Sequence, residues 1–275
     1  MRPVAFISGA SRGIGRETAI AFARAGFDIA ISARTVTPGE VHAHAVRHAD
    51  GRALAGSLAD TAEAARAFGG AVLPLRMDLL DEASLRQAAR EAIGHFGRLD
   101  VLINNALYQG EDLNRPFLEL ETQTLTRVAQ GYLIAPFLLA RELVPTMLEQ
   151  GGGTVINITS GAGECDPPVP AGQGGWGYAY GAGKAAVSRL SGILARELGE
   201  RGIRAYTVNP GVVATETLEA TLGEQGVHAL GHRAAPPTLP AAVLLWLATS
   251  PEAPAHQYRT LHAQPFAREQ GIVVE

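Results

Sequence analysis

The sequence lacks the features that would place it among disulfide-stabilised or nucleic-acid-binding proteins. Cys165 is the one cysteine among its 275 residues, so no disulfide can form within the chain and an oxidising compartment is not implied. The 23 Lys and Arg residues against 27 Asp and Glu residues give a net charge of -4, without a basic run that could neutralise a phosphate backbone. We therefore expect no nucleic-acid partner.

The sequence also shows no clear targeting or membrane-spanning stretch. Its first apolar run, Val4 to Ile7, is too short for the hydrophobic region of a signal peptide, and Ser8 and Gly9 follow it directly. No later stretch reads as long and apolar enough to cross a bilayer. These absences predict a cytoplasmic protein without a membrane partner.

Hydrophobic residues make up 47% of the sequence and charged residues 18%, which allows a large core in one domain spanning residues 1-275. Apolar β-branched runs, typical of strands buried on both faces, alternate with segments of helical periodicity. The predicted strands are Val4 to Ile7, Ile29 to Ser32, Val72 to Leu75, Val101 to Ile103, Thr154 to Ile158 and Ala205 to Val208, and the predicted helices are Ile14 to Ala25, Glu82 to Phe96, Leu118 to Leu148 and Tyr178 to Glu200. This alternation predicts an α/β fold, a Rossmann-like doubly wound parallel sheet in a three-layer α/β/α arrangement.

Three stretches interrupt the alternation: Thr35 to Gly70, Gly161 to Gly177 and Thr217 to Pro240. Each follows the carboxyl end of a predicted strand. Open α/β sheets bind their ligands beyond these strand ends. We therefore expect the three insertions to lie at the ligand-binding edge.

A glycine-rich turn, Ser8 to Gly15, joins the first predicted strand directly to a helix. Gly9 permits a tight turn, Gly13 the approach of backbone N–H groups to a pyrophosphate, and Gly15 close packing of the helix on the strand. The spacing differs from the best-known dinucleotide fingerprint, so an ordinary loop is an equal alternative for the turn alone.

Two arginines indicate the cofactor. An acid at the end of the second strand would hold the ribose hydroxyls of NAD, but Arg34 follows that strand, and Arg12 lies inside the glycine turn. Both cations are placed for a 2′-phosphate, which favours NADP(H) over NAD(H), although solvated surface arginines are the alternative. Asp78, after the third strand, is a candidate acceptor for the adenine amino group or simply a turn residue.

Tyr180 and Lys184 stand at positions i and i+4 of a predicted helix, on one face. A phenol with a pKa of about 10 is a poor acid/base at neutral pH, and a neighbouring ammonium stabilises the phenolate and lowers that pKa. Ser160 ends the fifth predicted strand, where its hydroxyl can bind a substrate carbonyl oxygen. The alternative for the pair is a core tyrosine and a solvated lysine.

Five motifs together resemble the short-chain dehydrogenase/reductase family in order and approximate spacing, from residue 4 to about residue 250. They are Gly9/Gly13/Gly15, Asn104-Asn105-Ala106, Ser160, Tyr180/Lys184 and Asn209-Pro210-Gly211. The resemblance implies an NADP(H)-dependent oxidoreductase that transfers hydride between nicotinamide and a carbonyl compound or secondary alcohol. Tyr180 would act as acid/base, Ser160 would orient the oxygen, and Lys184 would also hold the nicotinamide ribose.

The cofactor site combines the residues read from the turn and strand ends with those that the resemblance implies. By the resemblance, Asn105 and Ala106 line the cofactor path, Pro210 to Val212 face the nicotinamide carboxamide, and Thr215 lies near the pyrophosphate. The full predicted set is Gly9, Ser11, Arg12, Gly13, Ile14, Gly15, Arg34, Asp78, Leu79, Asn105, Ala106, Tyr180, Lys184, Pro210, Gly211, Val212 and Thr215.

The sequence departs from the family pattern in two places near the catalytic residues. Leu107 replaces the glycine that usually follows Asn-Asn-Ala. Tyr132 takes the place of the helical asparagine that anchors a proton-relay water in this family, with Gln130 as a weaker candidate. Tyr132 is therefore a candidate catalytic residue with three open roles: holding a water, contacting substrate or packing in the core.

The remaining departures concern substrate and assembly. The insertion Gly161 to Gly177 is longer than is common in the family and contains no Lys or Arg, which favours a neutral, bulky carbonyl substrate in a pocket lined by Tyr108, Tyr132 and Trp176. The family's usual C-terminal Gly-Gly is absent, while Tyr258 to Ala263 is a candidate last strand. The resemblance also implies a homodimer or homotetramer formed through the two long helices.

Three other interpretations of the sequence are a metal site, a reactive cysteine and a protein without turnover. His42, His44 and His48 suggest a metal cluster, but no nearby cysteine completes it and we expect no metal. Cys165 has no cationic neighbour in sequence that would lower its thiol pKa, so a packing or loop role is preferred. A nucleotide-binding regulatory or scaffold protein that has lost turnover is the alternative function, motivated by Tyr132.

Overall fold

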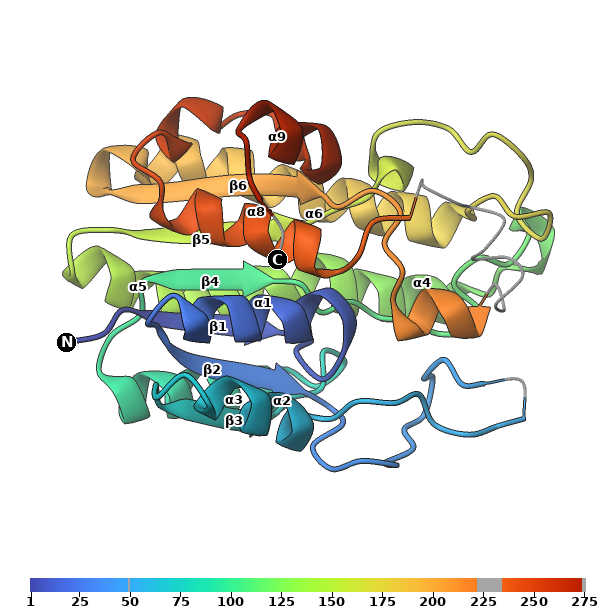
Figure 1. The fold of residues 1–275 in the computed structure, drawn as a ribbon. Coiled ribbons are helices and arrows are strands. Elements are labelled where there is room, and N and C mark those ends of the chain that lie inside the picture. Colours follow the sequence, from blue (N-terminus) through green and yellow to red (C-terminus); the bar gives the residue numbers. More distant parts are fainter. Residues whose placement is uncertain (49, 222–233, 274–275) are drawn as a thin grey trace.

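The computed structural model describes residues 1–48, 50–221 and 234–273. Its strands form one parallel seven-stranded sheet in the order β3-β2-β1-β4-β5-β6-β7. The strands are β1 Val4–Ser8, β2 Asp28–Ala33, β3 Val72–Arg76, β4 Val101–Asn104, β5 Gly153–Ile158, β6 Ile203–Asn209 and β7 Thr260–His262. The chain order reverses between β1 and β4, so the carboxyl ends of these strands flank the switch point at which such sheets bind ligands (Figure 1).

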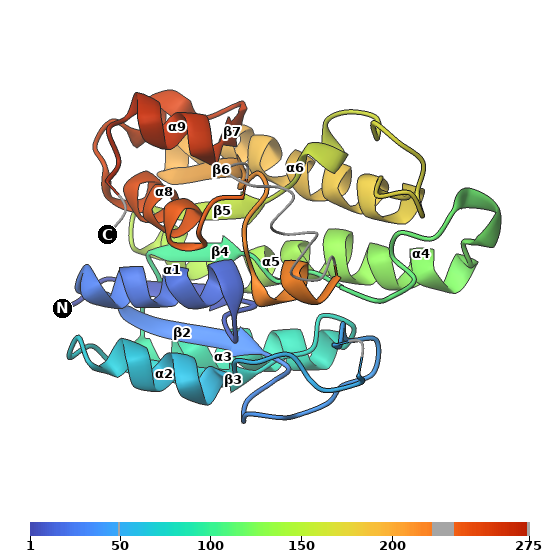
Figure 2. The same ribbon diagram turned by 45° about the vertical axis from the view of Figure 1, so that its right-hand side comes forward.

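Helices cover both faces of the sheet (Figures 1 and 2). Alternate side chains of β1 enter two cores: Ala5 and Ile7 pack against the first helix layer, and Val4 and Phe6 against the second. The first layer contains α1 Gly13–Arg24, α2 Leu58–Arg66, α8 Thr238–Thr249 and α9 Ala263–Glu269, and the second contains α3 Glu82–Phe96, α5 Ala135–Glu149 and α6 Tyr178–Leu198. This confirms the predicted Rossmann-like α/β/α fold.

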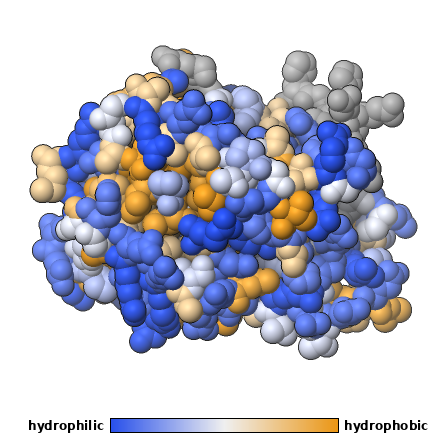
Figure 3. Space-filling view, turned by 90° about the horizontal axis from the view of Figure 1, so that it is seen from below, coloured by the Kyte–Doolittle hydropathy of each residue, from blue (hydrophilic) through white to orange (hydrophobic). Residues whose placement is uncertain are grey.

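The edge strand β3 explains an unusual proline. Pro74 pairs with Ile31 of β2 on one side and has no strand on the other, so its missing N–H breaks no ladder. Val72, Leu73 and Pro74 are only partly buried. Seen from the side on which β3 lies, the surface shows an apolar patch surrounded by hydrophilic side chains (Figure 3).

The six predicted strands begin and end within two residues of the observed ones, and the seventh, β7, lies within Tyr258 to Ala263. The single helix predicted for Leu118 to Leu148 is wrong in detail. It consists of α4 Thr122–Val128, a π-helical segment η2 Ala129–Ile134, and α5, with the short helix η1 Phe117–Glu119 before them. Pro136 lies in the first turn of α5 and has no N–H to donate to the carbonyl of Tyr132, and the π-helical turn ends just before it.

The predicted interruptions also need correction. The second half of Thr35 to Gly70 forms α2, capped by Ser57, whose Oγ accepts a hydrogen bond from the N–H of Asp60 at 3.1 Å. The part before it, residues 36–48 and 50–57, is irregular, and we name it the β2–α2 loop; residues 67–70, after α2, form a short turn. Of Thr217 to Pro240, residues 222–233 lie outside the described residues, and α8 begins at Thr238.

The expectation that no stretch is long and apolar enough to cross a bilayer was wrong for one helical stretch. The helical stretch Thr122–Glu149 is long and apolar enough, by length and composition, to cross a bilayer. In the fold, however, 56% of its most apolar window is buried. Leu138, Leu139 and Leu143 pack into the core of the second helix layer, which accounts for the apolar composition.

The short helices that remain flank the ligand-binding edge or the far end of the sheet. They are η3 Gly161–Gly163, η4 Gly199–Arg201 and η6 Ala253–His256.

Candidate active site

The carboxyl end of β5 and the first turns of α6 bring three predicted catalytic residues together. Ser160 lies two residues after the end of β5, and Tyr180 and Lys184 lie on α6. Burial raises the pKa of Tyr180, and the neighbouring Ser160 hydroxyl offsets part of this increase. The hydroxyl therefore stays protonated in this conformation and is placed to donate a proton.

Lys184 is buried rather than solvated, with 2% of its surface exposed. Its Nζ donates to the carbonyl oxygen of Ile158 at 3.0 Å and lies 5.7 Å from the ring centroid of Tyr132 and 6.0 Å from that of Tyr180. Burial lowers the pKa of Lys184 to about 7. The side chain can therefore change its protonation state near neutral pH, next to the phenol.

Close packing fixes α6 against its neighbours. A Cβ on Gly163 would lie 2.7 Å from the carbonyl carbon of Lys184, and a Cβ on Gly183 would lie 2.8 Å from Cδ1 of Tyr132. Thr159, at the end of β5, also forms a hydrogen bond to Ser188 of α6, with an Oγ1–Oγ distance of 2.6 Å. Glycine is thus required at these two points, where α6 touches η3 and η2.

Tyr132 lies at the centre of this packing and is 1% exposed. Its hydroxyl donates to the carbonyl oxygen of Tyr108 at 2.9 Å, and its ring stands edge-on to Tyr180 at a centroid distance of 6.4 Å. Burial raises the pKa of Tyr132 well above its ordinary value. Direct contact with substrate does not fit this burial. Gln130 points elsewhere, because its Nε2 donates to the carbonyl oxygen of Leu79.

The glycine turn after β1 has the geometry expected of a pyrophosphate cradle. Gly9 and Gly13 have φ angles of +69° and +54°, and a Cβ on Gly15 would lie 2.2 Å from the carbonyl oxygen of Gly9. The side-chain amide of Asn105 donates to the carbonyl oxygens of Ser8 and Gly9 at 3.0 and 3.1 Å, which holds the turn open. The first turn of α1 contains no acid, and its N-cap, Arg12, makes no side-chain hydrogen bond to the helix, as suits an anion-binding helix end. Oε2 of Glu216 would lie 3.6 Å from a Cβ on Gly13, so an anion bound there would also meet this carboxylate.

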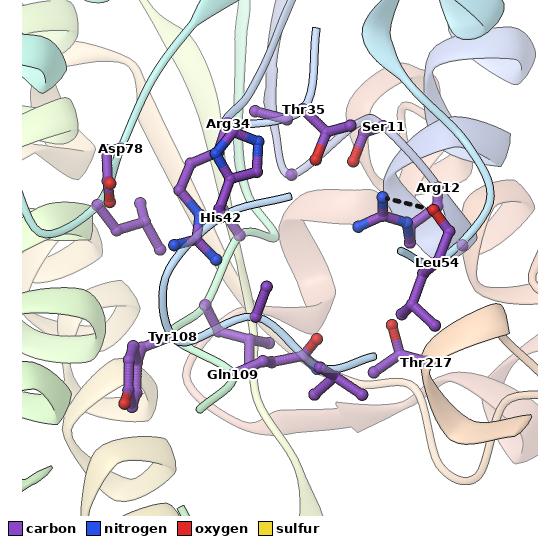
Figure 4. A pocket seen from close by; sticks show the side chains of 18 of the residues that line it. Ser11, Arg12, Arg34, Thr35, His42, Leu54, Asp78, Tyr108, Gln109 and Thr217 are labelled. Atoms are coloured by element: carbon purple, nitrogen blue, oxygen red, sulfur yellow. Dashed lines mark hydrogen bonds between the residues drawn. The ribbon is translucent and has the colours of Figure 1, made fainter. Parts of the chain in front are cut away.

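A cavity of about 250 Å³ adjoins this turn (Figure 4). The predicted cofactor residues that line it are Gly9, Ser11, Arg12, Gly13, Ile14, Arg34, Asp78, Leu79, Asn105, Ala106 and Thr215. Ser160, Tyr180, Lys184 and Pro210 to Val212 are not among its lining residues, so it covers the nucleotide end of the site and stops short of the catalytic end. Asp78 Oδ1 accepts a bond from the N–H of Leu80, as its alternative turn role requires.

Arg12 and Arg34 face this cavity but also hold the β2–α2 loop. Arg12 donates from Nε to the carbonyl of Ala55 at 2.8 Å and from Nη2 to that of Gly56 at 3.1 Å, and Arg34 donates to the carbonyl of Ala43 at 2.8 Å. Figure 4 shows Arg34 and Arg12 on opposite sides of the pocket. A phosphate group would share their donors with the loop.

Sequence reasoning missed an acid in this cavity. Glu40, from the β2–α2 loop, lines it and accepts hydrogen bonds from Arg76 at 2.9 and 3.0 Å. These bonds and those from Thr37 hold the pKa of Glu40 far below its usual range. Glu40 is not adjacent to β2 in sequence, so no local pattern marked it. Nε2 of His42 lies 3.4 Å from Oε2 of Glu40. Among the described residues, no group of three or more His, Cys, Asp or Glu side chains is placed to hold a metal ion.

Two aromatic residues predicted to line the substrate pocket, Tyr108 and Trp176, differ in burial. Tyr108 is buried, and its hydroxyl donates to Asp112 at 2.8 Å. Trp176 is partly buried, in the segment just before α6.

Cys165 is exposed in the loop between η3 and α6, where its thiol donates to the carbonyl of Gly161 at 3.3 Å. Asn114 accepts a bond from the N–H of Gly177, the N-cap of α6, at 3.1 Å.

The Asn209-Pro210-Gly211 turn follows β6 on the other side of η3. Gly211 has a φ of +74°, and its N–H donates to Oδ1 of Asn209 at 3.0 Å. Thr215, further along, approaches the glycine turn: its Cγ2 would lie 3.2 Å from a Cβ on Gly13. The turn therefore leads from the catalytic end of the site back to its nucleotide end.

Known proteins share both this sequence and this fold. A model of the family described as short chain dehydrogenase matches residues 52–225. A short chain dehydrogenase from Monascus purpureus is 32% identical over 212 residues, which cover 77% of this chain and 65% of the relative's own length. The chain thus spans slightly less than two thirds of that relative.

Two further matches cover a larger share of the matched protein. The 7alpha-hydroxysteroid dehydrogenase of Escherichia coli strain K12 is 30% identical over 218 residues, 79% of this chain and 74% of the relative. A solved 7 alpha-hydroxysteroid dehydrogenase complexed with NADH and 7-oxo glycochenodeoxycholic acid has a TM-score of 0.75 and 27% identity, with 94% of this chain and 92% of that chain covered. With the glycine turn and the Ser160, Tyr180 and Lys184 geometry, these matches show that the chain belongs to the short-chain dehydrogenase family of oxidoreductases.

Proposed function

We propose that the protein is an NADP(H)-dependent oxidoreductase that transfers hydride between nicotinamide and a carbonyl compound or secondary alcohol. The observation that carries the proposal is the buried Lys184, whose Nζ lies 6.0 Å from the ring centroid of Tyr180, with Ser160 close to the same phenol. A phenol that lies beside a serine hydroxyl and near a lysine of lowered pKa is suited to moving one proton to or from a substrate oxygen.

The residues of this chain would divide the work as follows. The bound nicotinamide cofactor supplies or accepts the hydride at the substrate carbon. In the reducing direction, the Tyr180 hydroxyl gives its proton to the substrate oxygen, which the Ser160 hydroxyl holds by a hydrogen bond. Lys184, whose Nζ lies 6.0 Å from the Tyr180 ring centroid, stabilises the phenolate that remains. Its burial keeps bulk water from screening this charge.

The cofactor assignment within this proposal is NADP(H). Arg12 and Arg34 line the nucleotide cavity, and no acid stands at the end of β2 itself. Glu40 lines the same cavity, but its carboxylate is bound to Arg76. The solved hydroxysteroid dehydrogenase is complexed with NADH, so a direct comparison is needed. Titration with NADPH and NADH decides it, and equal affinities would remove the proposed phosphate clamp.

The substrate class within this proposal is a neutral, bulky ketone. The loop Gly161 to Gly177 contains no Lys or Arg that could hold an anionic group. The solved relative is complexed with 7-oxo glycochenodeoxycholic acid, a bulky ketone that also carries an acid group, so it supports the bulk of the proposed substrate and not its neutrality. The kcat/KM values for cyclic or aryl ketones should exceed those for small keto acids and acyl thioesters. A strong preference for the small anionic compounds would contradict this assignment.

We also propose a homodimer or homotetramer built on the long helices. Leu133 and Phe137 of the η2–α5 stretch and Ile193 of α6 are large apolar side chains that remain about half exposed in one chain. A symmetric association through these helices would cover them. Light scattering at micromolar concentration tests this, and a strictly monomeric mass would contradict it.

The central test is consumption of NADPH by the purified protein against a panel of ketones and aldehydes. Oxidation of NADPH that is lost in Tyr180→Phe would support the proposal. Tight NADPH binding without turnover of any compound would instead favour the alternative, a nucleotide-binding regulatory or scaffold protein of the same fold.

A further inference from the structure

The short helix η3 lies between the catalytic helix and the turn that follows β6. On one side, Gly163 packs against the backbone of Lys184, where a Cβ would come within 2.7 Å of its carbonyl carbon. On the other side, a Cβ on Gly161 would lie 3.8 Å from the side-chain amide of Asn209. Glu164, which ends η3, therefore stands where the insertion meets two parts of the site.

A chain of hydrogen bonds runs from Glu164 into the turn Asn209-Pro210-Gly211. The amide of Asn209 donates from Nδ2 to Oε1 of Glu164 at 2.9 Å. The other atom of the same amide, Oδ1, accepts the N–H of Gly211 at 3.0 Å. Because one planar amide makes both bonds, the position of the Glu164 carboxylate fixes the direction of the Gly211 N–H.

His262, at the end of β7, completes the cluster. Its Nε2 lies 3.3 Å from Oε2 of Glu164, and its Nδ1 lies 3.4 Å from Nδ2 of Asn209. His262 is 54% exposed at its side chain and Glu164 27%, so this ion pair is screened by solvent and contributes little. Asn209 is only 6% exposed, so the bond between Glu164 and Asn209 is the stronger and better shielded contact.

The turn needs such a support. Gly211 has a positive φ and is exposed, and Val212 is 38% exposed, so little packing restricts this turn at its near end. Its far end is tied down separately, because the carbonyl of Val212 accepts bonds from the N–H of Ala235 at 2.9 Å and from Gln264 at 3.1 Å. Asn209 thus holds the near end of this turn, as Ala235 and Gln264 hold its far end.

We propose that Glu164 is a positioning residue that aligns the nicotinamide-facing turn, Pro210 to Val212, with the catalytic helix that carries Tyr180 and Lys184. The inference rests on the proposed function for the statement that this turn faces nicotinamide. The carboxylate of Glu164 touches neither the nucleotide cavity nor Tyr180 in the described structure. It acts through Asn209, and its effect is confined to the nicotinamide half of the cofactor.

The test compares two ligands that share the nucleotide end. NADPH contains nicotinamide, whereas adenosine 2′,5′-bisphosphate contains only adenosine with its 2′-phosphate and 5′-phosphate. In Glu164→Ala, the Kd of NADPH should rise about tenfold, as expected for the loss of a charge-assisted hydrogen bond, while the Kd of adenosine 2′,5′-bisphosphate stays unchanged. The unchanged Kd also shows that the variant is folded. An unaltered ratio of the two Kd values would overturn the proposal.

A donor–acceptor exchange separates positioning from a general structural role. Asn209→Asp places a carboxylate against Glu164 and should weaken NADPH binding at least as much as Glu164→Ala. The double variant Glu164→Gln with Asn209→Asp restores one donor and one acceptor in reversed order and should recover most of the NADPH affinity. Failure of the double variant to bind NADPH better than Asn209→Asp would overturn the proposal. His262→Ala, the matched control, should change the ratio less than twofold because its ion pair is exposed.

These binding measurements remain informative whatever the catalytic result. If wild-type protein binds both ligands but reduces no carbonyl compound, the proposed function fails while the Kd ratio still decides the role of Glu164. If wild-type protein binds adenosine 2′,5′-bisphosphate no more weakly than NADPH, nicotinamide gains nothing from this turn and the inference about Glu164 fails on its own.

Discussion

The two ends of the site are built in different ways. At the proposed catalytic end, Ser160 lies just after β5 and Lys184 lies on α6, and the two elements are joined by hydrogen bonds from Lys184 Nζ to the carbonyl of Ile158 and from Thr159 Oγ1 to the carbonyl of Lys184. At the nucleotide end, Arg12 and Arg34 are held by the carbonyl oxygens of the β2–α2 loop. Under the proposed function, the backbone contacts of α6 preorganise the catalytic end, whereas the nucleotide end would exchange hydrogen-bond partners when a phosphate enters.

This difference has an energetic consequence. Under the proposed function, substitution of Tyr180 removes the group that moves the proton, so its effect falls on kcat. At the nucleotide end, a phosphate takes donors that already bind carbonyl oxygens of the β2–α2 loop, so breaking those hydrogen bonds offsets part of the free energy of binding. We therefore expect larger effects at the catalytic end than at the nucleotide end.

The largest effect should follow Tyr180→Phe, which removes the proton-transferring hydroxyl and keeps the ring. We expect kcat for ketone reduction to fall about a thousandfold, within the range for loss of a general acid, while the Kd of NADPH changes less than twofold. Steady-state kinetics and fluorescence titration measure the two quantities. Near-normal turnover of this variant at pH 7 would show that another group supplies the proton.

The next effect concerns Lys184 and the pH dependence of stability. Its pKa is lowered to about 7 in the folded protein, against about 10.4 in an unfolded chain. Between pH 7 and pH 9 the unfolded chain therefore binds a proton at this lysine that the folded protein does not, so stability rises with pH, by up to about 1.4 kcal/mol for each pH unit. Below pH 7 both states hold the proton and this contribution is flat.

Comparison with Lys184→Met isolates this contribution, because methionine has a similar length and no charge. Urea unfolding of both proteins at pH 6, 7, 8 and 9 gives the difference in the free energy of unfolding. The free energy of unfolding of the wild-type protein should increase relative to that of the variant as pH rises above 7. A constant difference across this range would mean that Lys184 keeps an ordinary pKa despite its burial.

At the nucleotide end, Arg34→Ala should weaken NADPH binding about tenfold and leave NADH binding nearly unchanged. Arg12→Ala should affect both cofactors, because Arg12 also ties down the β2–α2 loop through Ala55 and Gly56. Isothermal titration with both cofactors gives the four affinities. If Arg34→Ala weakened the binding of NADPH and of NADH equally, Arg34 would not act as a specific partner of the 2′-phosphate.

The fold was largely predictable because its signals are local. Apolar runs such as Ile29 to Ser32 and the helical spacing of Glu82 to Phe96 carry their own periodicity, and both form the expected elements. The capped helix α2 was missed although Ser57 and Asp60 marked its start. The π-helical turn η2 was missed because periodicity alone does not distinguish it from an α-helix.

The site was predictable only where its residues are close in sequence or carry a motif. Tyr180 and Lys184 lie four positions apart, so helical geometry places them together. In contrast, Arg12 meets Ala55 across 43 residues and Asn209 meets Glu164 across 45, and neither contact follows from any local pattern. Such contacts depend on how loops return to the sheet edge, which sequence spacing does not specify.

The smallest expected effect is at Tyr132, where the two ends of the site approach one another through Tyr108. Tyr132→Phe removes a buried hydroxyl whose described partner is the carbonyl of Tyr108, and keeps the ring that packs against Lys184 and Tyr180. Loss of this bond should lower the free energy of unfolding by about 1 kcal/mol. Because the hydroxyl is buried and directed at a backbone oxygen, kcat should change less than threefold. A loss of a hundredfold or more, with NADPH affinity intact, would mean instead that Tyr132 takes part in proton transfer as the family's asparagine position implies.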